Sequence, residues 1–267
     1  MRIRVKLARV LIRVGKIIQS FAIMIMRTDD LVAFSRQTYE KNRNITPKAE
    51  EAWVDRGLTA LEEEITERIS IKTGKLLLLG IGAGREALRL SRKGFEVTGV
   101  DFIPELVERA RKHGARHGYR IHALVQEISK LEVPNRTFDV VWLSSAMYSC
   151  VPTRKRRIRM LKRIHAALKS DGWFVCGFQR DVGYHLSRKA EIARKIIAII
   201  CFGNLAYEKG DILWQNLEYL HNFTTIEEIV SEWTDGGFDV IHLDTTKGLT
   251  IGVALLRPKI RHPEEGN

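Results

Sequence analysis

Residues 76–88 read Leu76-Leu-Leu-Leu-Gly80-Ile-Gly82-Ala-Gly84-Arg-Glu-Ala-Leu88, an apolar run followed by three glycines at alternate positions and then a helical pattern. The run has the length of a buried strand, and the glycines permit a tight turn and a close approach of the backbone to a ligand. A helix expected from Arg85 to Arg92 would direct its free N–H groups and positive dipole end at that turn. The stretch therefore predicts a site for a nucleotide-type cofactor at the carboxyl edge of a parallel sheet.

A second apolar run, residues 95–100, ends at Asp101, about 20 residues after the glycine turn, which is the spacing expected of an acid that binds a ribose. A carboxylate at that place can accept hydrogen bonds from both ribose hydroxyls. A dinucleotide fingerprint would require a glycine at position 85, where this chain has Arg85. The alternative interpretation is a plain structural turn in an unrelated α/β domain.

The Gly-x-Gly-x-Gly spacing resembles the first motif of the class I S-adenosylmethionine-dependent methyltransferases, and later segments are similar to that family in the same order. The resemblance covers about residues 75–180 and 223–257. It implies an α/β fold: a Rossmann-like, mostly parallel seven-stranded sheet with helices on both faces and an antiparallel C-terminal hairpin. It also implies S-adenosylmethionine as the cofactor and methyltransferase activity (EC 2.1.1.-). The segments that carry the resemblance after the glycine turn are 97–106, 123–131, 137–145, 161–175, 237–243 and 252–256.

The same resemblance assigns cofactor-binding roles to residues at the ends of the first four strands. Asp101 would hold the ribose and Phe102 would lie against the adenine. Glu127 replaces the family's usual aspartate at the adenine amino group, and Ile128 would offer its backbone N–H. The full expected set is Gly80, Gly82, Gly84, Glu86, Asp101, Phe102, Glu127, Ile128 and Ser144.

Leu78 departs from the family, which usually carries an acid two residues before the first glycine to orient the methionine amino group. We predict that Glu86, on the first helical turn after the glycines, supplies the missing carboxylate. The alternative is that Glu86 only complements the helix dipole.

The chain has 267 residues and a net charge of +12, which favours anionic partners, either a membrane surface or a nucleic acid. Its cysteines, Cys150, Cys176 and Cys201, are far apart and lack metal-ligand spacing, so we expect reduced thiols, a cytoplasmic location and no metal site. Residues 153–163 carry seven basic side chains on a helical pattern, which indicates a solvated face or a contact with phosphate or membrane. No RNA-binding module is recognisable, which makes nucleic acid an unlikely partner.

Residues 1–26 predict a basic amphipathic helix. Its basic side chains recur every three or four residues among apolar ones, and the uncharged run 17–26 is too short to span a bilayer. Such a helix would lie in the headgroup region of an anionic membrane, so we expect a protein peripheral to its inner face. The alternative is a helix packed on its own domain or on a dimer partner. The stripe consists of Arg2, Lys6, Arg9, Arg13, Lys16 and Ser20.

The rest of the chain divides into a helical cap at 27–74, a methyltransferase domain at 75–257 with a substrate-lid insertion at 181–222, and a tail at 258–267. In the cap, Tyr39 and Trp53 could line the cofactor cleft, although packing against the sheet is the preferred interpretation. The insertion contains a helical pattern over residues 186–202, whose isoleucines could face substrate or lipid.

Methyl transfer is an in-line displacement, so a base helps only if the acceptor must lose a proton. The candidate catalytic residues are His221, Tyr148, His185 and Asp181, with His221 preferred because it precedes the turn into the last helix. Together these observations predict a methyltransferase acting on a lipid or another hydrophobic small molecule at a membrane surface. The alternatives are a soluble small-molecule methyltransferase, an RNA methyltransferase, and a cofactor-binding interaction protein without enzymatic activity.

Overall fold

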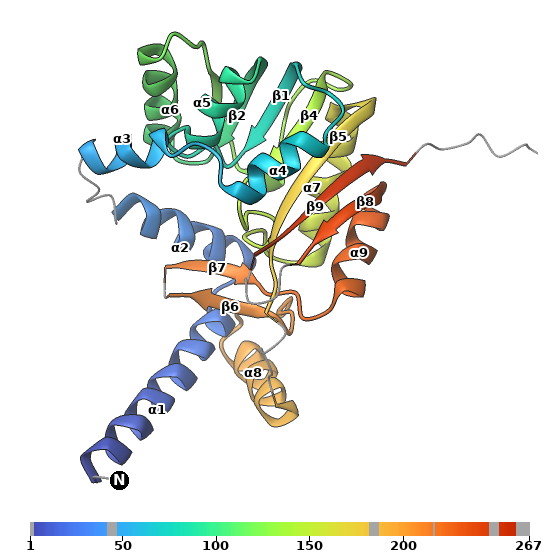
Figure 1. The fold of residues 1–267 in the computed structure, drawn as a ribbon. Helices are drawn as coiled ribbons and strands as arrows, with labels where there is room; N and C mark the ends of the chain where they lie inside the picture. The colour runs from blue at the N-terminus through green and yellow to red at the C-terminus, as the bar shows by residue number, and fades with distance from the viewer. Residues whose placement is uncertain (1–2, 42–46, 182–186, 216, 246–250, 260–267) are drawn as a thin grey trace, which may run out of the picture.

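The computed structural model describes residues 3–41, 47–181, 187–215, 217–245 and 251–259 (Figure 1). Its centre is a seven-stranded sheet in the order β3-β2-β1-β4-β5-β9-β8, in which β1 to β5 run parallel and β8 and β9 pair antiparallel. This confirms the expected fold. The strands are β1 (Gly74–Leu79), β2 (Phe95–Asp101), β3 (His122–Val125), β4 (Phe138–Leu143), β5 (Leu168–Gln179), β8 (Phe238–Asp244) and β9 (Ile251–Pro258).

Alternate residues of β1 enter two different apolar layers, because successive side chains of a strand point to opposite faces of the sheet. Leu77 and Leu79 join the layer under α7 (Arg154–Ala167) and α9 (Ile226–Asp235). Leu76 and Leu78 join the other layer, under α4 (Ala60–Arg68), α5 (Arg85–Arg92) and α6 (Pro104–Arg116). Leu78 is fully buried, so an acid at that position would be surrounded by apolar side chains.

The N-terminal segment and the insertion meet beyond the carboxyl edge of the sheet (Figure 1). The cap supplies α2 (Thr28–Lys41) and α3 (Pro47–Asp55), and the insertion supplies α8 (Arg188–Ile200) and a hairpin of β6 (Asp211–Trp214) and β7 (Glu218–His221). The backbone N–H of Tyr219 donates to Ser35 Oγ at 2.9 Å, which joins β7 to α2. The helices agree with the sequence patterns, whereas the hairpin was not expected.

Two helices, α1 (Ile3–Ile25) and α8, extend away from the sheet and are called the basal helices below (Figure 1). Their inner ends are joined by a hydrogen bond from Asn204 N to Met24 O at 2.8 Å. Ile23 and Met24 are buried there, whereas the apolar side chains nearer the start of α1 are exposed, for example Leu11 at 63%. Among the described residues, no helix is long and apolar enough to cross a membrane.

Candidate cofactor and acceptor site

The glycine turn joins the end of β1 to the start of α5. Gly80 and Gly84 have φ angles of +81° and +98°, in the left-handed region that glycine adopts without strain. Gly80 N and Ile81 N both donate to Val100 O, at 2.8 and 3.0 Å, so the turn is fixed to the end of β2. A Cβ added at Gly84 would lie 3.2 Å from Ala110 Cα on α6, so the turn also requires a small residue for packing.

Asp101 ends β2 and is 7% exposed. One carboxylate oxygen accepts a hydrogen bond from Gly82 N at 3.0 Å and the other accepts one from Ile103 N at 3.0 Å. Burial raises the pKa of Asp101, and the backbone N–H groups oppose that rise. An ionised carboxylate has further lone pairs, so Asp101 can still accept bonds from a ligand.

A cavity lies at this edge of the sheet and brings together five of the predicted cofactor residues: Gly80, Asp101, Phe102, Glu127 and Ile128. The remaining wall comes from α2, from the loop after β4 and from the insertion. Its other lining residues are Val32, Ser35, Tyr39, Ser129, Met147, Cys150, Val151, Pro152 and Glu218.

The neighbouring residues fit a bound polar cofactor. A Cβ built on Gly82 would meet nothing within 4 Å, so the turn opens onto free space. Ser144 is 4% exposed, and its Oγ has no hydrogen-bond partner among the described residues. A buried hydroxyl without a partner is costly, and a ligand that hydrogen-bonds to it would remove that cost. Glu127 is positioned by Ser129 and by Lys130, whose Nζ lies 3.1 Å from its carboxylate.

Glu86 is buried beside the turn and does not line this cavity. Its carboxylate pairs with Arg85 Nη2 at 2.7 Å, and Arg85 also makes two hydrogen bonds of 2.8 Å to Glu62 on α4. Burial raises the pKa of Glu86, and the Arg85 charge opposes that rise. The structure thus gives Glu86 a partner within the protein, and its role toward the methionine amino group stays a prediction.

The candidate catalytic residues lie in three different environments. Tyr148 is fully buried and its hydroxyl donates to Glu232 at 2.6 Å. Asp181 is exposed, and its backbone oxygen accepts a hydrogen bond from Asn222 at 3.1 Å. His185 lies outside the described residues.

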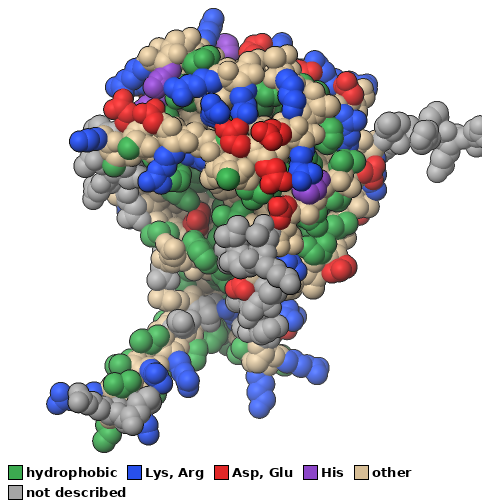
Figure 2. Space-filling model, viewed as in Figure 1, with side chains coloured by type: hydrophobic (Ala, Val, Ile, Leu, Met, Phe, Trp, Pro, Cys, Tyr) green, Lys and Arg blue, Asp and Glu red, His purple; other side chains and the backbone are tan. Residues whose placement is uncertain are grey.

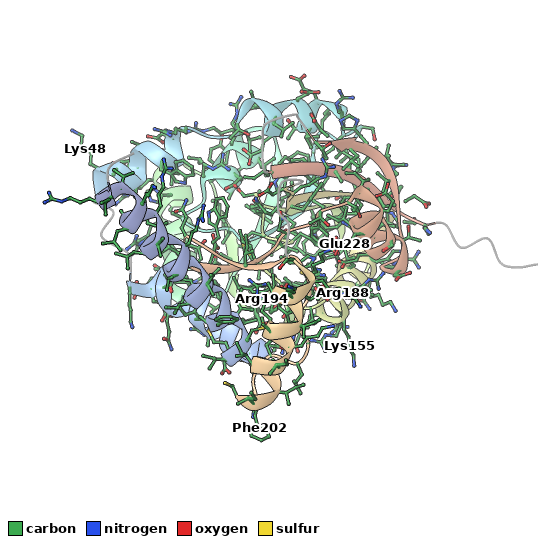
Figure 3. The ribbon with its side chains drawn as sticks, turned by 90° about the horizontal axis from the view of Figure 1, so that it is seen from below. Lys48, Lys155, Arg188, Arg194, Phe202 and Glu228 are labelled. Carbon is green, nitrogen blue, oxygen red and sulfur yellow. The ribbon has the colours of Figure 1, made fainter. Side chains whose placement is uncertain are left out.

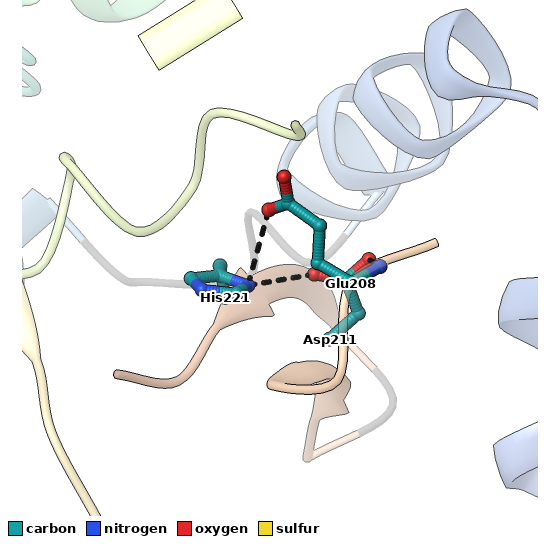
Figure 4. Close-up of side chains that lie close together, drawn as sticks. All are labelled: Glu208, Asp211 and His221. Atoms are coloured by element: carbon teal, nitrogen blue, oxygen red, sulfur yellow. Dashed lines mark hydrogen bonds and ion pairs between the residues drawn. The ribbon is translucent and has the colours of Figure 1, made fainter. Parts of the chain in front are cut away.

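His221 is 1% exposed and belongs to a polar cluster with Glu208 and Asp211 (Figure 4). Its Nδ1 lies 2.9 Å from Asp211 and 3.5 Å from Glu208, and its Nε2 lies 3.2 Å from Glu228. Burial lowers the pKa of His221, but the hydrogen bonds to Asp211 and Glu228 outweigh that effect and raise it.

The ligand atoms of Glu208, Asp211 and His221 lie within 4.8 Å of one another, a spacing that could hold a metal ion. Arg157 already supplies a cation there, because its Nη2 lies 2.7 Å from Glu208 and 2.7 Å from the fully buried Glu232. The cluster therefore connects the insertion to α7 and α9 through charges that are already paired.

Sequence reasoning missed Glu218, which lines the cavity together with Tyr39. Tyr39 donates a hydrogen bond of 2.6 Å to Glu218, and Cys150 Sγ lies 3.8 Å from the same carboxylate. The preferred interpretation of Tyr39 and Trp53, packing against the sheet, is wrong: they are 45% and 52% exposed, and Tyr39 and Glu218 also line a neighbouring cavity with Trp53. No local pattern marked Glu218, because its place depends on the hairpin.

The fold and the site define a class: a Rossmann-like domain that binds a nucleotide-type cofactor at a glycine turn. The family of methyltransferase domains matches residues 76–172, from β1 to the start of β5. These residues thus form a methyltransferase domain of the class I S-adenosylmethionine-dependent family, as their motifs indicated.

Individual relatives are similar to this chain over part of its length. An uncharacterized methyltransferase of Schizosaccharomyces pombe is 28% identical over 151 residues, 54% of this chain and 51% of that protein. A ubiquinone biosynthesis O-methyltransferase of Xylella fastidiosa is 36% identical over 67 residues, 25% of this chain and 27% of that protein. The chain thus spans about half or less of the length of these relatives.

Solved structures confirm the fold. A 1,6-didemethyltoxoflavin-N1-methyltransferase of Burkholderia thailandensis, with 1,6-didemethyltoxoflavin and S-adenosylhomocysteine bound, superposes with a TM-score of 0.61 at 17% identity and covers 87% of this chain and 91% of its own. An S-adenosylmethionine-dependent methyltransferase of Methanosarcina mazei superposes with a TM-score of 0.58 at 23% identity, and the match covers 76% of this chain and 99% of that one.

Proposed function

We propose that this protein transfers a methyl group from S-adenosylmethionine to a small-molecule acceptor (EC 2.1.1.-). The observation that supports this most is the cavity in which the glycine turn, Asp101, Phe102 and Ile128 meet. The match of residues 76–172 to methyltransferase domains adds independent support. Binding of S-adenosylmethionine but not NAD, measured by calorimetry, is the first test.

Bound S-adenosylmethionine would supply a methyl group activated by its sulfonium charge, and the protein's task is to position the two reactants in line. Asp101 would accept hydrogen bonds from the ribose, and Phe102 and Ile128 would flank the adenine. Met147 and Val151 give the same cavity an apolar surface that excludes water. For Tyr148 and His221, whose polar atoms bond within the protein, we propose a positioning role that holds the insertion in place.

We further propose that the acceptor is a lipid or another hydrophobic molecule met at an anionic membrane surface. The basal helices support this. On α8, the exposed isoleucines at positions 192, 196, 199 and 200 share one face, with exposures of 50% to 69%, and Phe202 beyond its end is 78% exposed. Figure 3 shows Phe202 just beyond the C-terminal end of α8, with Arg188 and Arg194 earlier along the helix.

The first part of α1, like α8, exposes apolar side chains. Its apolar side chains are exposed, including Ile3 at 84% and Leu7 at 59%, and the basic Arg4, Lys6 and Arg13 are exposed among them (Figure 2). This part of α1 therefore does not pack on its own domain, which was one of the two alternatives for the helix. Basic and apolar side chains together favour an anionic lipid surface.

Vesicle flotation of the full chain tests this proposal. We expect binding to vesicles with phosphatidylserine, weaker binding to phosphatidylcholine alone, and a clear loss in Leu7→Asp/Leu11→Asp and in Ile196→Asp/Ile199→Asp. The control Ile241→Asp changes an apolar residue of β8 that is 54% exposed and should bind like the wild type. If the wild type does not float but is dimeric by light scattering, and the α1 variant is monomeric, then α1 serves dimerisation.

The remaining alternatives are separated by the fate of the methyl group. Incubation of cell extract with S-adenosylmethionine labelled in the methyl group should place the label in the lipid fraction. Label in water-soluble small molecules would indicate a soluble acceptor, and label in RNA would indicate an RNA methyltransferase. Cofactor binding without transfer to any fraction would favour an interaction protein.

A further inference from the structure

Glu218 is a partly buried acid on the wall of the cofactor cavity that lies opposite the glycine turn. Its carboxylate accepts the hydrogen bond from Tyr39 at 2.6 Å and lies 3.8 Å from Cys150 Sγ. Both neighbours are neutral donors. Burial raises the pKa of Glu218, and these two hydrogen bonds only oppose that rise.

No lysine, arginine or histidine forms an ion pair with Glu218 in the part of the chain that the structure describes. The other acids near the cavity are better compensated. Glu127 pairs with Lys130, and Asp101 accepts two backbone N–H groups. Removing an ionised carboxylate from water is costly unless a cation or several donors replace the water. Among the described acids that line the cavity, Glu218 is therefore the one that would gain most from a cation bound beside it.

Two other positions, 78 and 86, could have supplied a carboxylate to the cofactor, but neither one places an acid in the cavity. Position 78 holds a leucine that is fully buried under α5 and α6. Glu86 is paired with Arg85 and does not line the cavity. Glu218, from β7 of the insertion, does line the cavity.

We propose that Glu218 binds a positively charged group on the methionine end of the cofactor, with Tyr39 as the residue that positions its carboxylate. This inference rests on the proposed function, because S-adenosylmethionine carries a sulfonium and an ammonium group. The pair also joins α2 of the cap to β7 of the insertion, so a cation bound there stabilises the contact between these two segments.

The test measures binding of three probes by calorimetry: S-adenosylmethionine, S-adenosylhomocysteine, which lacks the sulfonium, and methylthioadenosine, which lacks both charges. We expect Glu218→Gln to weaken S-adenosylmethionine by roughly tenfold to a hundredfold, the range of a hydrogen bond to a charged group, and to leave methylthioadenosine unchanged. Loss of S-adenosylhomocysteine binding to the same degree assigns the contact to the ammonium, and a smaller loss assigns it to the sulfonium.

Two variants test whether Glu218→Gln acts only by disturbing the local structure. Glu218→Asp keeps the charge and should retain most of the preference for charged probes. Glu40→Gln removes an acid one residue from Tyr39 that pairs with Arg36 on the helix surface, and it should bind all three probes like the wild type. The inference is overturned if Glu218→Gln binds S-adenosylmethionine normally, or if it weakens all three probes equally. A wild-type protein that binds none of the probes would instead contradict the proposed function.

Discussion

The cofactor cavity has two walls that are built in different ways. The sheet wall, made by the glycine turn, Asp101 and Ile128, comes from about 50 consecutive residues and follows the ends of adjacent strands. The opposite wall, made by Tyr39 and Glu218, joins residues that are 179 positions apart. The difference teaches that the wall proposed to hold the nucleoside is local in sequence, whereas the wall proposed to face the reacting end is assembled by the fold.

The two walls also differ in what holds them. The sheet wall rests on buried strands and on backbone hydrogen bonds such as Gly80 N to Val100 O at 2.8 Å. The opposite wall rests on a smaller apolar cluster, which includes the buried Leu31 and Tyr219, and on polar contacts such as Tyr219 N to Ser35 Oγ and Arg157 to Glu208. Segments with few buried apolar contacts open at lower free-energy cost. The opposite wall is thus the one expected to move when ligands enter.

The largest expected effect is on the sheet wall. Asp101→Asn should weaken S-adenosylmethionine at least tenfold and up to a few hundredfold, because a charged acceptor contributes about 1.5–3 kcal/mol and the same carboxylate holds Gly82 N in place. Calorimetry measures the dissociation constant. The control Asp55→Asn removes an exposed acid of α3 and should leave it unchanged. A normal affinity in Asp101→Asn would mean that the sheet wall is not the nucleoside site.

The sheet wall could be predicted because its determinants are short-range. An apolar run, three glycines and an acid about 20 residues later specify a strand, a turn and a second strand whose ends must meet at one edge. The antiparallel β8–β9 pair could be predicted only through the family resemblance. Leu78 was recognised as a departure, but its burial under α5 and α6 required the packed sheet.

The opposite wall could not be predicted for a physical reason. Whether a side chain near a strand end faces the cavity or the core depends on partners far along the chain. Tyr148 is drawn into the core by Glu232, 84 residues away, and His221 by Asp211, its partner across the hairpin. The pattern around Glu218 indicates neither the hairpin nor its neighbour Tyr39.

A smaller effect tests whether Tyr39 acts through Glu218. Tyr39→Phe should weaken S-adenosylmethionine about twofold to tenfold in the wild-type background, because one hydrogen bond that positions the carboxylate, about 0.5–1.5 kcal/mol, is lost. In the Glu218→Gln background the same change should have much less effect, since residues in direct contact are energetically coupled. A double-mutant cycle by calorimetry measures this coupling, and the cycle of Tyr39→Phe with Glu40→Gln should be additive. If the effects of Tyr39→Phe and Glu218→Gln on affinity are additive, then Tyr39 does not act through Glu218.

The smallest expected effect concerns the cluster that anchors the insertion behind the opposite wall. The pKa of His221 lies above its ordinary value of 6.5 in the folded protein, because its hydrogen bonds to Asp211 and Glu228 outweigh its burial. A histidine with a raised pKa binds its proton more tightly in the folded state. Its contribution to stability is therefore fully present below about pH 6.5 and is lost as the pH rises through the raised pKa.

Urea unfolding of wild type and His221→Gln at about pH 6 and about pH 8.5 measures that contribution. We expect the wild type to exceed the variant in free energy of unfolding by more at the lower pH, with His122→Gln on β3 as the control for loss of an exposed histidine. A difference that grows toward high pH would mean that His221 is held neutral. In that case the carboxylates of Asp211 and Glu228 would not act as its counter-charges.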